Sequence, residues 1–322
     1  MARVPSPHSS PAKAELHLHL EGSIEPDTLR ELEPSLTAEE IAPHYRHGDF
    51  LVFLENFKWI VGHLHCPDDY ALITRRLLDR LAAENVLYAE VTVSAGVILR
   101  RNQAFQPIYE AIGREAACGP VQVWWILDAV RQFGPQDAMP VAQLAAERAG
   151  DRVVAFGLGG DELRGPAPLF AEVFRFARGQ GLRLTCHAGE TGGPDAVRDA
   201  LDLGVDRIGH GIGAAQDPAL LRRLAAERVP LEVCITSNVA TGAVAGLEAH
   251  PVRQIFDAGV PVVLNTDDPA MFQTTLAAEF ELAAQRFGFS AAGLEELARN
   301  AFRYAFRQFE TPRAGAVEKS RK

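Results

Sequence analysis

Cysteine is scarce in this chain, and the spacing of the few cysteines excludes two kinds of site. The 322 residues include four of them, Cys66, Cys118, Cys186 and Cys234, which lie far apart and form no C-x-x-C pair. Neither a disulfide-stapled scaffold nor a cysteine zinc site fits this spacing. The pattern is typical of a protein from a reducing compartment.

Long apolar runs and runs of basic residues are also missing. No segment approaches the roughly 18 consecutive apolar residues of a membrane-spanning helix, and the N-terminal MARVPSPHSSPAK lacks the apolar centre of a signal peptide. Lysine and arginine number 32 against 42 acidic residues, for a formal net charge of −10. We therefore expect a cytoplasmic protein without a membrane segment or a nucleic-acid surface. The sequence leaves the oligomeric state open.

The chain instead has a globular composition and one recurring pattern. It is 47% hydrophobic and 23% charged, which suits a large core. Short apolar runs rich in β-branched residues alternate with amphipathic helical stretches such as 171–181, 217–229 and 250–260. There are eight such runs, at 14–22, 87–95, 121–129, 153–162, 183–190, 207–211, 231–238 and 260–269. This alternation predicts an α/β fold, a (β/α)8 barrel of the TIM type.

The expected domain organisation is simple because no proline- or serine-rich linker divides the chain. We expect a flexible leader at 1–12, a single catalytic barrel at 13–312 and a flexible tail at 313–322. The longest interval between strands separates the first from the second, and its apolar stretch at 48–62 has a helical pattern. In a barrel, such an insertion lies over the C-terminal mouth, where active sites are built, so it is a candidate lid.

The first predicted strand, in KAELHLHLEGS, places histidines in an apolar run. Alternation puts Leu16, Leu18 and Leu20 on one face and Glu15, His17, His19 and Glu21 on the other. The outer face of a barrel strand packs against helices, so the leucines should face outward and the histidines the lumen. An H-x-H pair alone is weak support for a metal site, and we assign the second one, at 63–65, to the surface or to packing.

Other predicted strands end in polar groups as well. Each has a simpler explanation on its own, such as a helix cap or a satisfied buried histidine. The C-terminal ends of barrel strands converge, however, so the groups should meet around one cavity. They are Gly160 with Asp161, His187 with Glu190, His210, and Asp267 with Asp268. Together with the first-strand histidines they suit zinc or a similar divalent ion.

These motifs match a known family. They read ELHLHLEGS (15–23), GGDE (159–162), HAGE (187–190), RIGHG (207–211), CITSN (234–238) and NTDDPAMF (265–272). Through them, in this order and over nearly the whole chain, the sequence resembles the adenosine and adenine deaminases of the amidohydrolase superfamily.

The resemblance implies a metal centre and an acid–base set. One zinc ion per chain would be bound by His17, His19, His187 and Asp267. Zinc lowers the pKa of its bound water, which would attack C6 of a purine, with Asp267 also counted as catalytic. Glu190, as a neutral acid, would protonate N1, and His210 would assist as a base or an electrostatic partner.

The resemblance also implies contacts to a small-molecule purine substrate. The backbone N–H of Gly160 would meet N3, Asp268 would accept a hydrogen bond on the N7 side, and Glu21 would lie near the 5' end of the sugar. The apolar helix would cover the ribose with Phe53, Leu54 and Phe57, whose spacing equally fits ordinary core packing.

The choice of substrate is where the chain departs from its relatives. Glu21 stands where adenosine deaminases commonly have aspartate, as in adenine deaminases, whereas Met271 departs from the adenine branch. We expect hydrolytic deamination at C6 of a 6-aminopurine nucleoside, either adenosine or a 5'-modified relative such as 6-amino-6-deoxyfutalosine. For the latter, Arg100 or Arg101 is a candidate partner of the carboxylate.

Three alternatives to this expectation remain. The first is a deaminase of free adenine. The second is a non-enzymatic binding barrel, which the presence of Glu190 and His210 disfavours. The third is a two-metal hydrolase, which is disfavoured because 153–162 holds no lysine that could be carboxylated between two metals.

Overall fold

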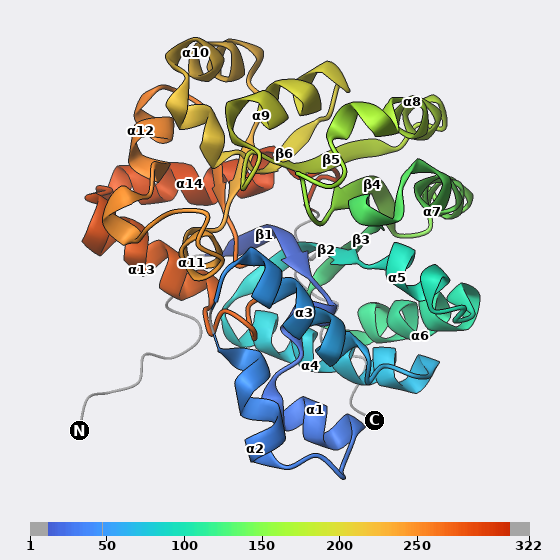
Figure 1. Cartoon of the computed structure of the whole chain (residues 1–322). Helices are drawn as coiled ribbons and strands as arrows, with labels where there is room; N and C mark the ends of the chain where they lie inside the picture. Colours follow the sequence, from blue (N-terminus) through green and yellow to red (C-terminus); the bar gives the residue numbers. More distant parts are fainter. Residues whose placement is uncertain (1–11, 47, 310–322) are drawn as a thin grey trace, which may run out of the picture.

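The computed structural model describes residues 12–46 and 48–309, and its centre is a barrel of eight parallel strands in sequence order. The strands are Lys13–His19 (β1), Val86–Val93 (β2), Gln122–Val130 (β3), Val153–Gly159 (β4), Arg183–Ala188 (β5), Arg207–His210 (β6), Leu231–Val233 (β7) and Val262–Leu264 (β8). Figure 1 shows them in the middle of the molecule with helices around them. The predicted (β/α)8 barrel is confirmed. Nearly all of the predicted leader at 1–12, and the whole predicted tail at 313–322, lie outside the described residues.

Asp267 provides the backbone hydrogen bonds that join the end of β8 to β1, and the Asn265 side chain accepts from the N–H groups of Leu16 and His17. The backbone N–H of His19 donates to the carbonyl oxygen of Asp267 at 2.8 Å, and the N–H of Asp267 donates to that of His17 at 3.1 Å. An isolated parallel bridge pairs Leu18 with Asp267. A predicted metal ligand is therefore held against two others by the closure itself.

The alternation expected for β1 breaks near its start. The pairing with β2 shifts register between Glu15 and Leu18. Leu18 belongs to the main core, whereas Leu16 packs in a separate small cluster that includes Tyr88. The Glu15 carboxylate accepts hydrogen bonds from the backbone and hydroxyl of Thr266, at 2.8 and 2.5 Å. A two-residue period therefore describes only the later part of this strand.

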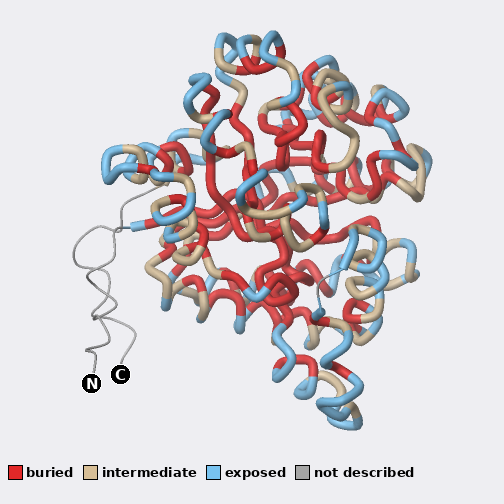
Figure 2. The backbone as a smooth tube through the Cα atoms, turned by 60° about the vertical axis from the view of Figure 1, so that its left-hand side comes forward, coloured by how far each residue is buried: buried red, intermediate tan, exposed pale blue. Residues whose placement is uncertain are grey.

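The helices cover the outside of the barrel, and Figure 2 shows buried backbone at the centre and exposed backbone on the outer helices. None of the helices in the described ranges is long and apolar enough to cross a membrane. After β2 they are Ala95–Arg100 (α5), Phe105–Cys118 (α6), Arg131–Phe133 (η4), Pro135–Glu147 (α7), Ala167–Phe170 (η5), Ala171–Gly179 (α8), Gly193–Asp202 (α9), Ile212–Gln216 (η6), Pro218–Glu227 (α10), Ile235–Ala240 (α11), Leu247–Ala249 (η7), Val252–Asp257 (α12), Leu276–Phe287 (α13) and Ala291–Arg303 (α14).

Two predicted strands are too long. The stretch predicted at 231–238 ends as a strand at Val233 and continues as helix α11, and that at 260–269 forms a strand only at Val262–Leu264. The N–H groups of Ile235 and Thr236 donate to a buried carboxylate oxygen of Glu279, at 2.9 and 3.3 Å. This carboxylate satisfies the free N–H groups at the start of α11, which explains why a helix replaces the strand.

The insertion between β1 and β2 is helical, as predicted. It comprises Glu21–Ser23 (η2), Pro26–Leu32 (α1), Ala38–Ile41 (α2), Ala42–Tyr45 (η3), Phe50–Val61 (α3) and Pro67–Ala83 (α4). Helix α3 corresponds to the helical pattern at 48–62. It begins after Asp49, whose side chain accepts a hydrogen bond from the N–H of Val52 at 2.9 Å. Side chains of α3 line the cavity at the mouth of the barrel.

Candidate active site

The ends of β1, β5 and β8 bring the four predicted metal ligands together. The Asp267 Oδ1 atom lies 3.2 Å from Nε2 of His17 and 3.3 Å from Nε2 of His19. The Nε2 atoms of His19 and His187 lie 3.2 Å apart. Ligand atoms about 2.0–2.1 Å from one zinc ion are themselves about 3–3.5 Å apart, whether the ion has four or five ligands. The donor set and its spacing therefore fit zinc.

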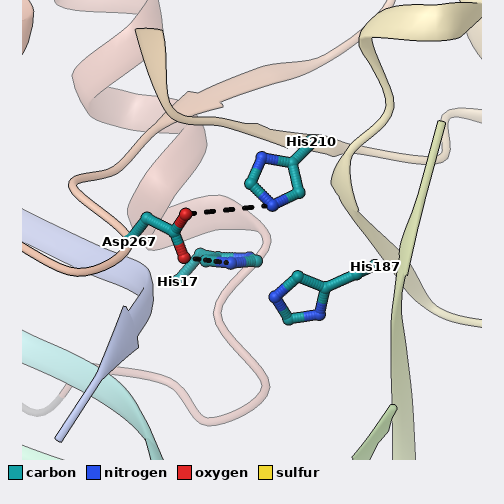
Figure 3. A group of neighbouring side chains, drawn as sticks. All are labelled: His17, His187, His210 and Asp267. Atoms are coloured by element: carbon teal, nitrogen blue, oxygen red, sulfur yellow. Dashed lines mark hydrogen bonds and ion pairs between the residues drawn. The ribbon is translucent and has the colours of Figure 1, made fainter. Parts of the chain in front are cut away.

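A fourth histidine joins this group from the end of β6. Ligand atoms of His17, His187, His210 and Asp267 all lie within 4.8 Å of one another. Figure 3 shows these four side chains gathered around one point. His210 Nε2 is 4.0 Å from Oδ2 of Asp267. That oxygen also accepts a hydrogen bond from the Ser237 hydroxyl at 2.6 Å. The two oxygens of Asp267 thus have different partners, and Oδ1 is the one directed at the predicted ligands.

Two site residues have an unusual backbone conformation. His210 and Asp267 have φ angles of +59° and +66°, in the left-handed region that residues other than glycine seldom adopt. Such conformations cost on the order of 1–3 kcal/mol each and concentrate at functional sites. Here they occur at or just after the ends of β6 and β8, where each chain turns out of the barrel.

A buried carboxylate orients His17 from behind. Glu232, on β7, lies 2.9 Å from His17 Nδ1 through its Oε2 atom, and its Oε1 atom pairs with Nε of Arg207. Arg207 also pairs with Glu90, at 2.6 Å. Burial alone would raise the pKa of Glu232, but the Arg207 guanidinium and the His17 hydrogen bond hold it below its ordinary value. An ionised Glu232 accepts from Nδ1 and so leaves His17 Nε2 free to bind a metal.

Glu190 lines the cavity, in surroundings that favour its neutral, protonated form. Burial, together with the carboxylates of Asp267 and Glu162, raises the pKa of Glu190 well above its ordinary value. Its Oε1 atom accepts a hydrogen bond from the Thr241 hydroxyl at 3.1 Å. The loop that carries it is fixed because the Glu162 carboxylate accepts from three consecutive backbone N–H groups, 189–191, at 2.7, 2.8 and 3.1 Å.

His210 lies between Glu190 and the predicted metal ligands. Its Nε2 atom is 3.6 Å from Oε2 of Glu190. Burial, helped by the nearby histidines His17 and His19, lowers the pKa of His210 to about 3, so its ring is neutral.

The predicted substrate contacts fall into two groups. Gly160, Asp268 and the three α3 residues Phe53, Leu54 and Phe57 line the cavity. Glu21 does not line it: its carboxylate accepts hydrogen bonds from the backbone and hydroxyl of Ser94, at 3.0 and 3.2 Å.

Space around Asp268 and Gly160 depends on glycine. Asp268 Oδ1 is buried with no hydrogen-bond partner among the described residues, and a Cβ on Gly22 would lie 1.8 Å from it. Burial and the charge of Asp267 raise the pKa of Asp268 well above its ordinary value. Gly160 has φ +94°, and a Cβ there would lie 2.3 Å from Gln132 Oε1. The backbone conformation therefore favours glycine at 160, and any side chain there would also have to displace the end of Gln132.

Comparison with known proteins places this geometry in a family. Residues 12–316 match the family model described as adenosine deaminase. The chain belongs to the adenosine deaminase family. It is 40% identical to aminodeoxyfutalosine deaminase of Streptomyces avermitilis, over 91% of this chain and 86% of that protein. It is 37% identical to adenine deaminase of Rhizobium leguminosarum bv. trifolii, over 94% and 97%.

Solved structures of adenosine deaminase family relatives agree with the fold. The crystal structure of adenine deaminase from Arthrobacter aurescens matches with a TM-score of 0.86 and 32% identity, over 93% of this chain and 95% of that one. An amidohydrolase from Burkholderia ambifaria, with bound Zn, matches with a TM-score of 0.86 and 27% identity, over 95% and 90%. As a member of the family, the chain is a metal-dependent hydrolytic deaminase.

The sequence analysis missed one acidic residue in the cavity of this adenosine deaminase family member. Asp128, on β3, lines the cavity, and burial raises its pKa to about 7. Gly157 and Gly159 of β4 leave it room, since a Cβ on either would come within 2.6 or 2.8 Å of its carboxylate oxygens. The sequence does contain a signal for Asp128, because it is an acidic residue near the end of an apolar run, WWILDAV.

The basic residue at the cavity also differs from the expected ones. Arg100 pairs with Asp137 at 2.8 Å, and Arg101 bonds the carbonyl oxygens of Val61 and Gly62. Neither arginine lines the cavity, whereas Lys58 of α3 does. Lys58 was missed because its contribution depends on how α3 docks over the mouth of the barrel.

Proposed function

We propose that the chain catalyses zinc-dependent hydrolytic deamination at C6 of a 6-aminopurine nucleoside, either adenosine or a 5'-modified relative such as 6-amino-6-deoxyfutalosine. The products are ammonia and the 6-oxopurine. The observation that carries this proposal is that a zinc-compatible cluster and a buried carboxyl group, Glu190, whose pKa burial raises, lie in the same cavity. Metal-assisted attack and protonation of the ring are the two requirements of this reaction.

One zinc ion per chain would be held by His17, His19, His187 and Asp267, where it supplies a water activated for attack. The protein's own groups do the rest. Glu190 donates its proton to N1, which makes C6 electrophilic and relieves the charge that develops in the ring. His210 Nε2 and Glu190 Oε2 lie 3.6 Å apart. Both groups would therefore reach the same part of the purine ring, around N1 and C6.

Three contacts orient the purine in this proposal. The N–H of Gly160 donates to N3, and side chains of α3 exclude water from above. Asp268 is assigned a different role from the one expected from the sequence. Purine N7 is an acceptor, so in this contact the Asp268 carboxyl would carry the proton and donate, and burial shifts its pKa in that direction. The open Oδ1 atom of Asp268 supports this contact.

For the substrate, we favour a nucleoside with an anionic group beyond the 5' carbon. Lys58 is the one lysine or arginine among the described residues that line the cavity. It stands on the same helix as the cavity-lining residues Phe53, Leu54 and Phe57. The likeness to aminodeoxyfutalosine deaminase supports this choice, and the likeness to adenine deaminase makes the free base the second candidate.

The test is ammonia release by the zinc-loaded protein on adenosine, 2'-deoxyadenosine, adenine and 6-amino-6-deoxyfutalosine, compared by kcat/KM. The protein stripped with a chelator, then reloaded with zinc, is the control for metal dependence. We expect 6-amino-6-deoxyfutalosine to be preferred. A dominant rate on adenine would favour the second candidate, and no release from any of the four with zinc bound would refute the proposal.

The role of Lys58 is tested by comparing the effect of one substitution on two substrates. Lys58→Met should lower kcat/KM for 6-amino-6-deoxyfutalosine by about tenfold or more, the value of one charge-assisted hydrogen bond, and leave adenosine nearly unchanged. Glu55→Gln is the matched control, because Glu55 pairs with Lys58 at 2.5 Å and does not line the cavity. An equal loss on both substrates would contradict the assigned contact.

A further inference from the structure

A series of hydrogen bonds between buried polar groups connects α12 to the active site. It begins at the backbone N–H of Val252, which donates to Nδ1 of His250 at 3.2 Å. A backbone N–H can only donate, so Nδ1 of His250 is an acceptor and carries no hydrogen. The His250 ring is therefore neutral, and its hydrogen is on Nε2.

The next link fixes the orientation of an amide. His250 Nε2 lies 3.2 Å from Oδ1 of Asn238, so the histidine donates and the amide oxygen accepts. The amide nitrogen then faces the other way, and Asn238 Nδ2 lies 3.0 Å from Nδ1 of His210. An amide NH2 only donates, so Nδ1 of His210 is also an acceptor.

We propose that His250 and Asn238 are positioning residues that fix His210 as the Nε2–H tautomer. All three side chains are at most 5% exposed, so water does not compete for these hydrogen bonds. The Nε2–H group of His210 is then directed into the cavity, where Nε2 lies 3.6 Å from Glu190 Oε2 and 4.0 Å from Asp267 Oδ2.

The tautomer decides what His210 does in the reaction. A ring with hydrogen on Nε2 and an occupied Nδ1 acceptor cannot take a proton from the attacking water. It donates a hydrogen bond to the attacking oxygen instead and stabilises the negative charge that develops there. This catalytic consequence rests on the proposed function, whereas the tautomer itself does not.

The first experiment measures the tautomer directly in the zinc-loaded protein. Long-range 1H–15N correlation spectra of 15N-histidine-labelled protein distinguish protonated from unprotonated ring nitrogens, and the His210 signals are those lost in His210→Asn. We expect Nε2 of His210 to be protonated and Nδ1 unprotonated. A wild-type His210 with hydrogen on Nδ1 would overturn the proposal, whether or not the protein deaminates any substrate.

The second experiment replaces Asn238, the residue that connects His250 to His210 through hydrogen bonds. In Asn238→Asp the carboxylate only accepts, so the spectrum should show a hydrogen on Nδ1 of His210 that the wild type lacks. Where Nε2 loses its hydrogen, kcat should fall by about 10²–10³-fold, as for loss of one donor to a developing oxyanion, with KM and zinc content much less affected. If Nδ1 of His210 stays unprotonated in this variant, Asn238 does not fix the tautomer and the proposal is wrong.

Two further variants separate positioning from folding. Asn300→Asp is the matched control, because Asn300 is also buried but bonds the carbonyl oxygen of Val262, and it should leave the His210 spectrum unchanged. His250→Phe removes the donor that orients the Asn238 amide, so the His210 signals should report both tautomers. A single Nε2–H signal in His250→Phe would show that His250 does not set the tautomer.

Discussion

Glu232 provides the sharpest test of how the barrel interior supports the metal site. Both of its carboxylate oxygens accept hydrogen bonds: Oε2 from His17 Nδ1 at 2.9 Å and from the Thr185 hydroxyl at 3.4 Å, and Oε1 from Nε of Arg207. Glutamine at this position has one oxygen and one NH2 group. Whichever way the amide turns, the NH2 group faces another donor, so Glu232→Gln leaves His17 or Arg207 without its partner.

The size of the loss follows from burial. All three side chains are nearly inaccessible, and removing one partner of a buried ion pair costs about 3–5 kcal/mol. Arg207 keeps Glu90 at 2.6 Å and the carbonyl oxygen of Tyr304 at 3.0 Å, so we expect the lower end, about 3 kcal/mol. Loss of the outer partner of a ligating histidine should weaken zinc binding by about 10–100-fold.

Two measurements check this prediction. Urea unfolding of the metal-free protein gives the change in stability, and competition with a chelator gives the zinc affinity. Glu90→Gln is the matched control, because Glu90 pairs with Arg207 but makes no contact with His17. It should lose stability and keep its zinc affinity. Zinc binding in Glu232→Gln within twofold of the wild type, or equally weakened in Glu90→Gln, would refute the reasoning.

Three further predictions concern acid catalysis, pH and packing. Glu190→Gln should retain zinc but lose about 10²–10⁴-fold in kcat, since an amide delivers no proton; near-normal steady-state turnover would remove Glu190 as the donor. Burial lowers the pKa of His250 from 6.5 to about 4, so only the unfolded chain binds that proton as the pH falls through this range. Stability should therefore drop by about 3 kcal/mol, and His250→Gln should abolish that part of the pH dependence of urea unfolding. Gly22→Ala displaces Asp268 and should raise KM about tenfold or more without changing zinc content; an unchanged KM would contradict the N7 contact.

The errors of the sequence analysis share one physical cause. Local pattern predicted a strand over 231–238, yet the carboxylate of Glu279, 44 residues after Ile235, accepts the N–H groups that begin a helix there. Strict alternation placed Glu15 on the face of the histidines, yet a register shift in β1 and the hydroxyl of Thr266 direct it elsewhere. Partners distant in sequence decided both cases.

Local sequence pattern is enough to predict the eight-stranded barrel and the end of it at which the cavity lies. Apolar runs and amphipathic helices repeat along the chain, and parallel strands converge at their C-terminal ends whatever the details of the helices. His17, His187 and Asp267 could therefore be assigned to one site from their places at strand ends, and the structure brings them within 4.8 Å of one another.

The orientation and protonation of those groups depend on contacts that form only in the folded chain. The contact of His17 with Glu232 joins residues 215 positions apart, and the amide of Asn238, on helix α11, meets His210 at the end of β6. Side-chain hydrogen bonds of this kind depend on register, rotamer and burial rather than on local pattern. Protonation state and tautomer follow from them, because a buried polar group takes the form that its few neighbours can satisfy.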